Sequence, residues 1–432
     1  MRIAVVGAGL SGLAAAWWLA KAGHRVTLHE RHDAPGFTAH SLAVEGALRG
    51  ERVDVPLRVF YPGYYPTLMR LYAELGAASE PVSYAGSFLD EHRHLYFRYR
   101  NLRWGDRSIG TWAPQDALLG ARAWRIGAGL LRLRSVVQRL AEQQRPQGLP
   151  TIGELAETEG LSVDLVDGFL LPVIATISTC TLADARQFPA DVVLGYITRG
   201  LASQAVRRAC GGADAVQARL VAGIPELRCR ARIAAVRPEA TGATLHHEDG
   251  RPETYDHVVL ATQANQALAL LAAPSDDEAR LLGSFGYVPV HVVTHRDATV
   301  MPRRRRDWSP VNLQLLPGSP SPVSTIWVNA VQPALRKAHN VFQTVAPAQP
   351  LRDVIGEARF ERPVVTAGSA AAWSGLQRLA AQPSRRIWFC GAYAASGIPL
   401  LESAVRSARD VVDRIAAAVA ATQAGLRADS SV

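Results

Sequence analysis

The chain has 432 residues, more than one simple hydrophobic core holds, so we expect about two to three domains. Hydrophobic residues make up 48% and charged residues 20%, an ordinary balance for a globular protein, and no segment reaches the roughly 18 uninterrupted apolar residues of a membrane span. The formal net charge of +9 favours anionic partners, but basic and aromatic residues do not interleave as nucleic-acid binding requires, so no nucleic-acid partner is predicted.

The first predicted element is a strand, helix and strand joined by a glycine-rich turn. Residues 2–6 form a short apolar run typical of a buried parallel strand, and a second strand is predicted at residues 24–29. Between them, GAGLSG at residues 7–12 precedes a helix rich in Ala and Leu, predicted from Leu13 to Ala22. A GxGxxG turn in this context predicts a dinucleotide site.

Each position of this turn has a physical role. Gly7 permits the tight bend, Gly9 lets the backbone approach a pyrophosphate, and Gly12 lets the helix pack closely on the strand. The helix N-terminus attracts phosphate. Glu30 is placed to bind the ribose hydroxyls, and its carboxylate disfavours the 2′-phosphate of NADP. The predicted cofactor contacts in this unit are Gly7, Ala8, Gly9, Leu10, Ser11, Gly12 and Glu30.

Two features favour a cytoplasmic protein without metal. The N-terminus enters the strand at once, without the basic segment and long apolar segment of a cleaved signal. The cysteines form no CxxC pair, so neither a disulfide framework nor a metal site is predicted. They are Cys180, Cys210, Cys229 and Cys390.

The next stretch alternates between predicted strands and helices. Residues 51–60 resemble a strand interrupted by Pro56, and a helix with leucines at helical spacing follows. Residues 81–104 are rich in aromatic residues and are predicted to form strands. Residues 116–200 are predicted to be mostly helical.

Beyond residue 210 the strands return. A helix is predicted to begin at 211–214, and strands are predicted over 228–260, with a hairpin turn at Asp249-Gly250. More strands are predicted over 285–329. From residue 386 the order is strand, glycine loop and a helix from Glu402 to about Ala418.

A dense basic run, Arg303 to Arg306, follows Met301-Pro302. We interpret it as a solvated loop. The alternative is a patch for an acidic substrate or for peripheral contact with a membrane surface.

The order of these motifs resembles the amine oxidase and phytoene desaturase superfamily of FAD oxidoreductases. The similarity is carried by VVGAGLSGLAAAWWLAKAGHRVTLHER at residues 5–31, GGADAV at 211–216, VVLAT at 258–262, and Phe389-Cys390-Gly391 with Glu402 to Ala408. Within the superfamily, the sequence is similar to a bacterial group of predicted NAD/FAD-binding proteins. Gly397-Ile398-Pro399 gives a weaker likeness to hydroxysqualene dehydroxylases.

The resemblance implies an α/β fold: a Rossmann-type FAD-binding domain, as in glutathione-reductase-like flavoproteins, with an interleaved mixed α+β substrate domain. The implied FAD-binding domain comprises residues 1–60, 205–275 and 380–420. The implied substrate domain comprises 61–204 and 276–379, with a mostly helical part at about 116–200. Residues 421–432 are expected to form a flexible tail.

The resemblance also implies FAD rather than NAD, because a simple NAD enzyme needs no second loop that faces a flavin. The further cofactor contacts that it implies are Arg31, His40, Ser41, Arg58, Ile233, Thr262, Gly391, Ala392, Leu401, Glu402 and Ser403.

The sequence departs from the family pattern near these contacts. Gly36-Phe37-Thr38 replaces the usual Gly-Gly-Arg, so Arg31 or Arg58 is expected to supply the missing charge. Ala392 stands where an acid often binds the ribityl chain, and Leu400 stands where amine oxidases often have an aromatic cage residue.

The resemblance implies that the apolar residues Pro399 to Leu401 lie near the flavin ring, in a dry site where the flavin is the redox reagent. The candidates for a catalytic role are Arg58, His40 and Tyr393. Arg58 is the favoured charge, His40 is alternatively a loop histidine, and Tyr393 is alternatively a packed tyrosine.

We therefore expect an FAD-dependent oxidoreductase that desaturates a C–C bond of an apolar, lipid-like or isoprenoid-like small molecule. The first alternative is an amine oxidase that acts on a specialised metabolite. The second is a redox-neutral flavin-dependent isomerase or a non-catalytic flavin-binding protein.

Overall fold

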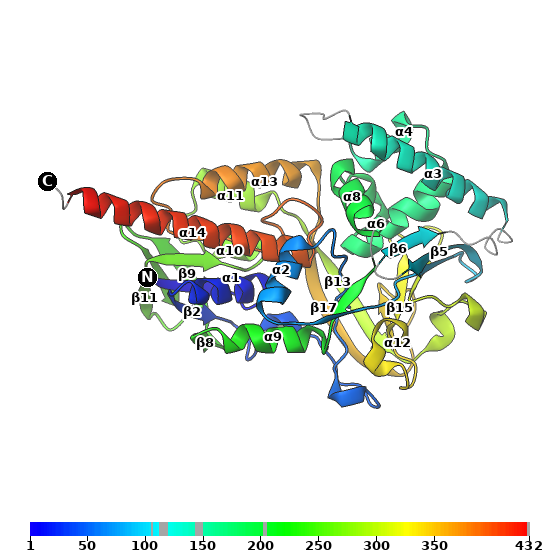
Figure 1. Cartoon of the computed structure of the whole chain (residues 1–432), viewed down its shortest axis with the longest axis horizontal. Helices are drawn as coiled ribbons and strands as arrows, with labels where there is room; N and C mark the ends of the chain where they lie inside the picture. The colour runs from blue at the N-terminus through cyan, green and yellow to red at the C-terminus, as the bar shows by residue number, and fades with distance from the viewer. Residues whose placement is uncertain (105–106, 112–119, 143–149, 202–204, 430–432) are drawn as a thin grey trace.

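A computed structural model of the chain describes residues 1–104, 107–111, 120–142, 150–201 and 205–429. Its N-terminal strand lies in the middle of a five-stranded parallel sheet with the order β18-β12-β1-β2-β8 (Figure 1). These strands are β1 (Arg2–Val6), β2 (Arg25–His29), β8 (Glu226–Arg228), β12 (His257–Leu260) and β18 (Ile387–Phe389). The apolar residues of β1 and β12 are buried, as expected for strands covered on both faces.

Helix α1 (Leu10–Lys21) is flanked by α9 (Gly212–Ala222) and α14 (Leu401–Asp429), so helices from both ends and the middle of the chain pack together (Figure 1). A three-stranded antiparallel sheet lies beside this unit. It consists of β9 (Ile233–Pro238), β10 (Ala243–His247) and β11 (Pro252–Tyr255). Helices α10 (Ala264–Leu270), α11 (Asp276–Gly283) and α13 (Ala367–Ala380) complete this part.

The second large sheet has eight strands in the order β17-β13-β16-β15-β14-β4-β5-β6. They are β4 (Gly86–Leu89), β5 (Leu95–Trp104), β6 (Arg107–Thr111), β13 (Tyr287–His295), β14 (Val311–Gln314), β15 (Val323–Trp327), β16 (Phe342–Val345) and β17 (Val354–Pro363). A small antiparallel pair, β3 (Ser79–Pro81) and β7 (Arg207–Ala209), stands apart.

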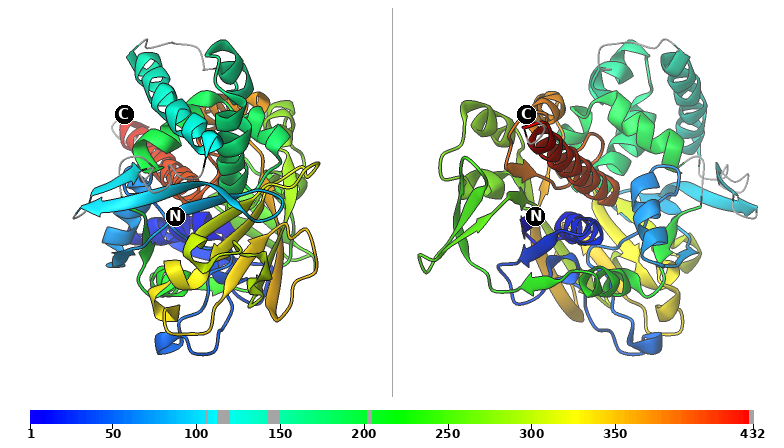
Figure 2. Two further views of the ribbon diagram at one scale, coloured as in Figure 1. Left: turned by 90° about the vertical axis from the view of Figure 1, so that its right-hand side faces the viewer. Right: turned by 60° about the vertical axis from the view of Figure 1, so that its left-hand side comes forward.

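A group of helices lies next to the eight-stranded sheet, at the end of the molecule away from β1 (Figures 1 and 2). It includes α3 (Ala121–Glu142), α4 (Ile152–Thr158), α5 (Val163–Leu165), α6 (Leu171–Ser178), α7 (Leu182–Arg186) and α8 (Ala190–Tyr196). The α/β fold class with a Rossmann-type domain is confirmed, whereas the domain boundaries stay a prediction.

Three element predictions need correction. Residues 51–60 form isolated bridges rather than a strand, since Pro56 has no N–H to donate to a ladder. Helix α1 begins at Leu10 rather than Leu13, because Gly9 is already its N-cap. Helix α14 continues to Asp429, past the predicted end near Ala418.

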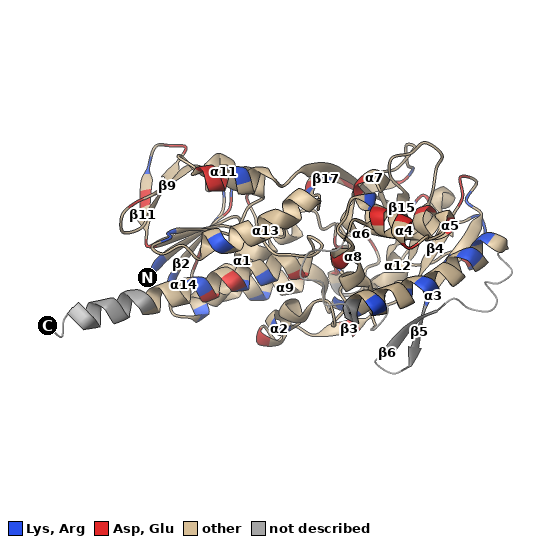
Figure 3. Cartoon of the chain, turned by 90° about the horizontal axis from the view of Figure 1, so that it is seen from above, with Lys and Arg blue, Asp and Glu red and all other residues tan. Residues whose placement is uncertain are grey.

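Among the described residues, no helix combines the length and apolar character that crossing a membrane requires. Basic residues lie along α3, which carries five arginines in its sequence (Figure 3). Three of them are engaged in ion pairs: Arg122 and Arg125 with Asp164, and Arg139 with Glu159 at 2.7 Å. Part of this positive row is therefore neutralised within the chain.

Candidate dinucleotide site

A cavity of about 1020 Å³ lies at the carboxyl ends of the parallel strands. The loops after β1, β2, β12 and β18 all contribute to its walls, and β1 lies between β2 on one side and β12 and β18 on the other. The helix N-terminus of α1 also contributes, through Leu10 and Ser11. A crevice at this place in a parallel sheet is where α/β proteins bind dinucleotides.

The glycine turn shows why larger residues do not fit. A Cβ on Gly12 would lie 1.8 Å from the carbonyl oxygen of Gly7. Gly7 has φ +102°, and its Cβ would lie 2.8 Å from the carbonyl oxygen of Ala261. A Cβ on Gly9, in contrast, would meet no atom within 4 Å, and Gly9 lines the cavity. Gly7 and Gly12 are thus required by packing, while Gly9 faces open space that a ligand fits.

Glu30 joins two loops of the cavity wall. Its Oε2 accepts a hydrogen bond from the N–H of Ala8 at 2.8 Å, and its Oε1 accepts one from the N–H of His32 at 3.0 Å. The side chain is buried. A carboxylate has about four acceptor positions, so Glu30 holds the glycine turn in place and still has lone pairs for ribose hydroxyls.

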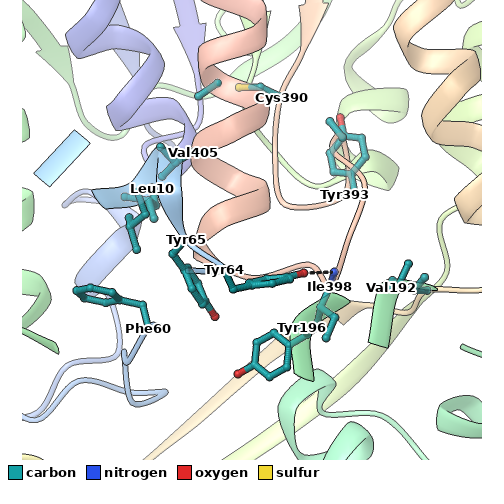
Figure 4. Close-up of a cluster of buried hydrophobic side chains, with 14 of the residues drawn as sticks. Leu10, Phe60, Tyr64, Tyr65, Val192, Tyr196, Cys390, Tyr393, Ile398 and Val405 are labelled. Atoms are coloured by element: carbon teal, nitrogen blue, oxygen red, sulfur yellow. Dashed lines mark hydrogen bonds between the residues drawn. The ribbon is translucent and has the colours of Figure 1, made fainter. Parts of the chain in front are cut away.

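Residues 391–400, which we call the closing segment, form the opposite wall. The N–H of Gly391 donates to Ser407 Oγ at 3.0 Å, and Trp373 Nε1 donates to the carbonyl of Tyr393 at 2.9 Å. The N–H of Ile398 donates to the hydroxyl of Tyr64 at 3.2 Å, as Figure 4 shows. Bonds to three different elements therefore fix the shape of this segment.

The cavity brings together most of the residues predicted to contact a cofactor. Those that line it are Gly7, Ala8, Gly9, Leu10, Ser11, Glu30, Arg31, Ile233, Thr262, Gly391 and Ala392, together with the catalytic candidate Tyr393. Burial raises the pKa of Tyr393 well above its usual range, so its hydroxyl stays protonated. The same hydroxyl has no hydrogen-bond partner within the described residues.

The other predicted contacts are not among the lining residues: Gly12, His40, Ser41, Arg58, Leu401, Glu402 and Ser403. Glu402 is buried and accepts hydrogen bonds from the N–H groups of Thr67 and Leu68, at 3.1 and 3.0 Å. It therefore caps helix α2 (Pro66–Glu74). The Ser403 hydroxyl donates to the carbonyl of Ile398 at 2.8 Å.

Arg58 and His40 contact phenylalanines and do not line the cavity. Arg58 donates from Nη2 to the carbonyl of Phe37 at 2.9 Å, and its guanidinium lies 4.5 Å from the centre of the Phe37 ring. His40 stacks on Phe360 at 5.7 Å between ring centres. Burial and the nearby Arg58 lower the pKa of His40, so this histidine is neutral at pH 7.

Sequence reasoning missed several residues of the cavity. Tyr287 and Arg362 come from strands β13 and β17 of the second sheet, and Gln263 and Gln266 follow β12. The tyrosine hydroxyl accepts from the N–H of Ala264 at 2.7 Å and so joins the two sheets. No local pattern marks these residues, because their approach to the glycine turn depends on how the sheets pack.

Behind the closing segment lies a cluster of buried aromatic residues (Figure 4). Tyr64 meets Tyr65 and Tyr196 in edge contacts, with ring centres 5.4 and 4.8 Å apart. Tyr61 is 1% exposed and meets Tyr196 at 5.8 Å. Burial raises the pKa values of these tyrosines, so they are neutral packing residues.

The basic run Arg303 to Arg306 does not line the cavity. Its residues are exposed, and Arg305 lies over Trp308 and Trp327, at 3.7 and 4.3 Å from the ring centres. Arg305 is therefore held against the second sheet by cation–π contacts.

Comparisons with known proteins agree with this geometry. Residues 5–75 match the NAD(P)-binding Rossmann-like domain family. The chain is 39% identical to 15-cis-phytoene desaturase of Synechococcus elongatus over 75 residues, which are 17% of this chain and only 15% of that protein. The chain therefore shares sequence with only a small part of this relative.

Solved structures share the fold over nearly the whole chain. A fatty acid isomerase from P. acnes that produces CLA has a TM-score of 0.66 and 17% identity, covering 96% of this chain and 98% of that one. Cyclohexylamine oxidase from Brevibacterium oxydans has a TM-score of 0.67 and 14% identity, covering 97% and 99%. Residues 5–75 thus share sequence with dinucleotide-binding domains, and nearly the whole chain shares its fold with these solved structures.

Proposed function

We propose that the chain is an FAD-dependent oxidoreductase that dehydrogenates a C–C bond of an apolar small molecule. The observation that carries this proposal is the single cavity of about 1020 Å³ that joins the glycine turn and Glu30 to the closing segment. Its walls come from the loops after β1, β2, β12 and β18, which suits a dinucleotide that extends across the ends of these strands.

The residues present fit FAD. Gly9 leaves open space for a pyrophosphate, Glu30 retains acceptor capacity for the ribose, and Ile233 lies at the same end of the wall. Thr262, Gly391 and Ala392 would hold the other half of the cofactor. Bound FAD would supply the hydride acceptor, and the chain would supply position and exclusion of water.

The walls near the closing segment favour an apolar substrate. Pro399 and Ala404 line the cavity there, and the neighbouring Tyr61, Tyr65 and Tyr196 are buried and uncharged. These uncharged side chains provide a surface for hydrocarbon, and Arg362 adds one charged group beside them. The similarity to a phytoene desaturase over 75 residues agrees with an apolar substrate.

An amine oxidase is the second candidate, since cyclohexylamine oxidase shares the fold. Against it, the charged side chain where the cavity meets the closing segment is Arg362, whose Nη2 donates to the carbonyl of Pro399. A guanidinium at this place would repel a substrate ammonium group.

The test uses the purified chain with its bound flavin under anaerobic conditions. Fatty acids and isoprenoid hydrocarbons are expected to bleach the flavin and to lose two hydrogens, which mass spectrometry detects. Bleaching by amines alone would contradict desaturation and support the second candidate. A product of unchanged mass would identify an isomerase, and a preparation that binds no FAD would end the proposal.

A further inference from the structure

Arg362 places a guanidinium at the wall of the cofactor cavity beside the closing segment. It is the residue before the end of β17, the edge strand of the second sheet, which pairs with β13. It lines the cavity together with Tyr393 and Pro399. Its Nη2 donates to the carbonyl of Pro399 at 3.1 Å, which fixes the guanidinium against this segment.

This charge has no counter-ion in the part of the chain that the structure describes. Its Nε is buried without an acceptor, and the hydrogen bond to Pro399 is made to a neutral group. Arg58 adds a second positive charge nearby. Burial and Arg58 lower the pKa of Arg362 to about 10, so the side chain remains a cation at neutral pH. A largely buried cation without a counter-ion is unfavourable, which points to an anionic partner in the cavity.

The position of Arg362 indicates which half of a dinucleotide it faces. Glu30 follows β2 and marks the ribose of the adenosine half, and the glycine turn after β1 marks the phosphates. Arg362 lies with the loops after β12 and β18, since its side chain contacts Pro399 and the neighbouring Glu361 carbonyl accepts from Gln263, and these two strands are on the side of β1 opposite to β2. In FAD that half carries the flavin ring.

We propose that Arg362 supplies the positive charge that stabilises the reduced flavin ring, an inference that rests on the proposed function. Transfer of a hydride to the neutral oxidised ring adds two electrons and one proton, so the ring gains one negative charge. A fixed guanidinium beside the ring lowers the free energy of this anion more than that of the neutral ring. Arg362 lines the cavity, whereas Arg58 does not line it, and the Arg58 guanidinium donates to the carbonyl of Phe37 and lies over the Phe37 ring.

Sulfite binding to the flavin tests the stabilising role of Arg362 without the need for a known substrate. Sulfite adds through sulfur to N5 of the oxidised flavin, forms an N–S bond and leaves the added negative charge on the adduct. We expect Arg362→Gln to weaken sulfite binding by about tenfold or more, which corresponds to about 1.4 kcal/mol. The flavin midpoint potential is expected to fall in the same variant, and Arg362→Lys is expected to retain much of both properties.

Arg359→Gln is the matched control. Arg359 lies on the same strand, its side chain is 75% exposed, and it is 3.6 Å from Glu357, so its loss changes the net charge equally without touching the cavity. Unchanged sulfite affinity and potential in Arg362→Gln would overturn the proposal. An equal effect in Arg359→Gln would also overturn it.

Wild-type protein provides a measurement that does not depend on the variant folding. After reduction on the acid side of neutrality, the bound flavin is expected to show the absorption spectrum of the anionic reduced ring. The spectrum of the neutral reduced ring would overturn the role of Arg362. Absence of bound FAD in the wild type would overturn the proposed function instead, so the two failures are distinct.

Discussion

At the residue scale, the glycines of the turn differ in what makes them necessary. Gly12 is confined by the carbonyl of Gly7, so a methyl group there has no room even without a ligand. A Cβ on Gly9 would meet no atom of the chain within 4 Å, so a larger residue there would interfere only with a ligand in the cavity. Substitution by alanine therefore separates folding from binding.

We expect Gly9→Ala to fold as stably as the wild type but to bind FAD less tightly, because its methyl group enters open space in the cavity wall. FAD titration followed by fluorescence, together with urea denaturation of the apoprotein, checks both parts. Gly283→Ala is the matched control, since its Cβ also meets no atom within 4 Å and Gly283 is the last residue of α11, away from the cavity. FAD affinity equal to that of the wild type would contradict the role of Gly9.

Gly12→Ala is expected to lower the free energy of unfolding by about 3 kcal/mol or more, because a Cβ 1.8 Å from a carbonyl oxygen forces α1 away from the strand. Urea denaturation of the apoprotein measures this loss. A stability like that of the wild type would show that the turn relaxes without cost.

At the scale of elements, the closing segment and α14 act as a support for the site. Glu402, a cofactor contact implied by the resemblance, joins the start of α14 to the start of α2. Ser407 binds both the N–H and the carbonyl of Gly391 from the next turns of α14. Through these bonds one helix holds both ends of the closing segment.

Glu402→Ala is expected to destabilise the fold by about 1–3 kcal/mol, because two buried N–H groups at the start of α2 lose their acceptor and the helix dipole loses a negative charge. Glu402→Gln keeps one acceptor oxygen, so a smaller decrease in the free energy of unfolding is expected. Chemical denaturation gives the difference in the free energy of unfolding, with Glu157→Gln, an exposed residue of α4, as the control. An equal decrease in the free energy of unfolding for Glu402→Ala and for the control would contradict the capping role of Glu402.

At the scale of the whole molecule, three buried histidines lie in the two large sheets: His29 and His257 in the five-stranded sheet, and His295 in the eight-stranded sheet. Burial lowers the pKa values of His29, His257 and His295 to about 4, from 6.5. All three are neutral in the folded protein at pH 7. His29 binds the hydroxyl of Tyr255, and His295 binds the hydroxyl of Thr344.

The free energy of unfolding is therefore expected to decrease as the pH is lowered. The pKa of each histidine is lower in the folded protein than in the unfolded chain. The contribution of each neutral histidine to stability is therefore complete above about pH 6.5 and is lost as the pH falls toward about 4. This loss amounts to up to about 3 kcal/mol for each histidine. Urea midpoints at about pH 7.5 and about pH 5 check this. An unchanged midpoint would contradict it, and His257→Asn is expected to reduce the slope.

The residues that local chemistry determines were predictable from the sequence. The strand, glycine turn, helix and acid of residues 2–30 act through backbone geometry that the chain carries within one segment, and the structure has each of these elements. The resemblance carried by the motifs implied the α/β fold class, and the structure has it. The dinucleotide cavity followed in part, since the residues next to the parallel strands line it.

The tertiary structure decided which charges reach the cavity and which serve the fold. Arg58 and Glu402 carry the chemistry of a site but pair with Phe37 and α2. Arg362 lies in a segment with no motif and reaches the cavity only because β17 crosses beside the closing segment. The physical reason is that strand and turn preferences act over a few residues, whereas the partner of a charged side chain depends on which distant segments pack against it.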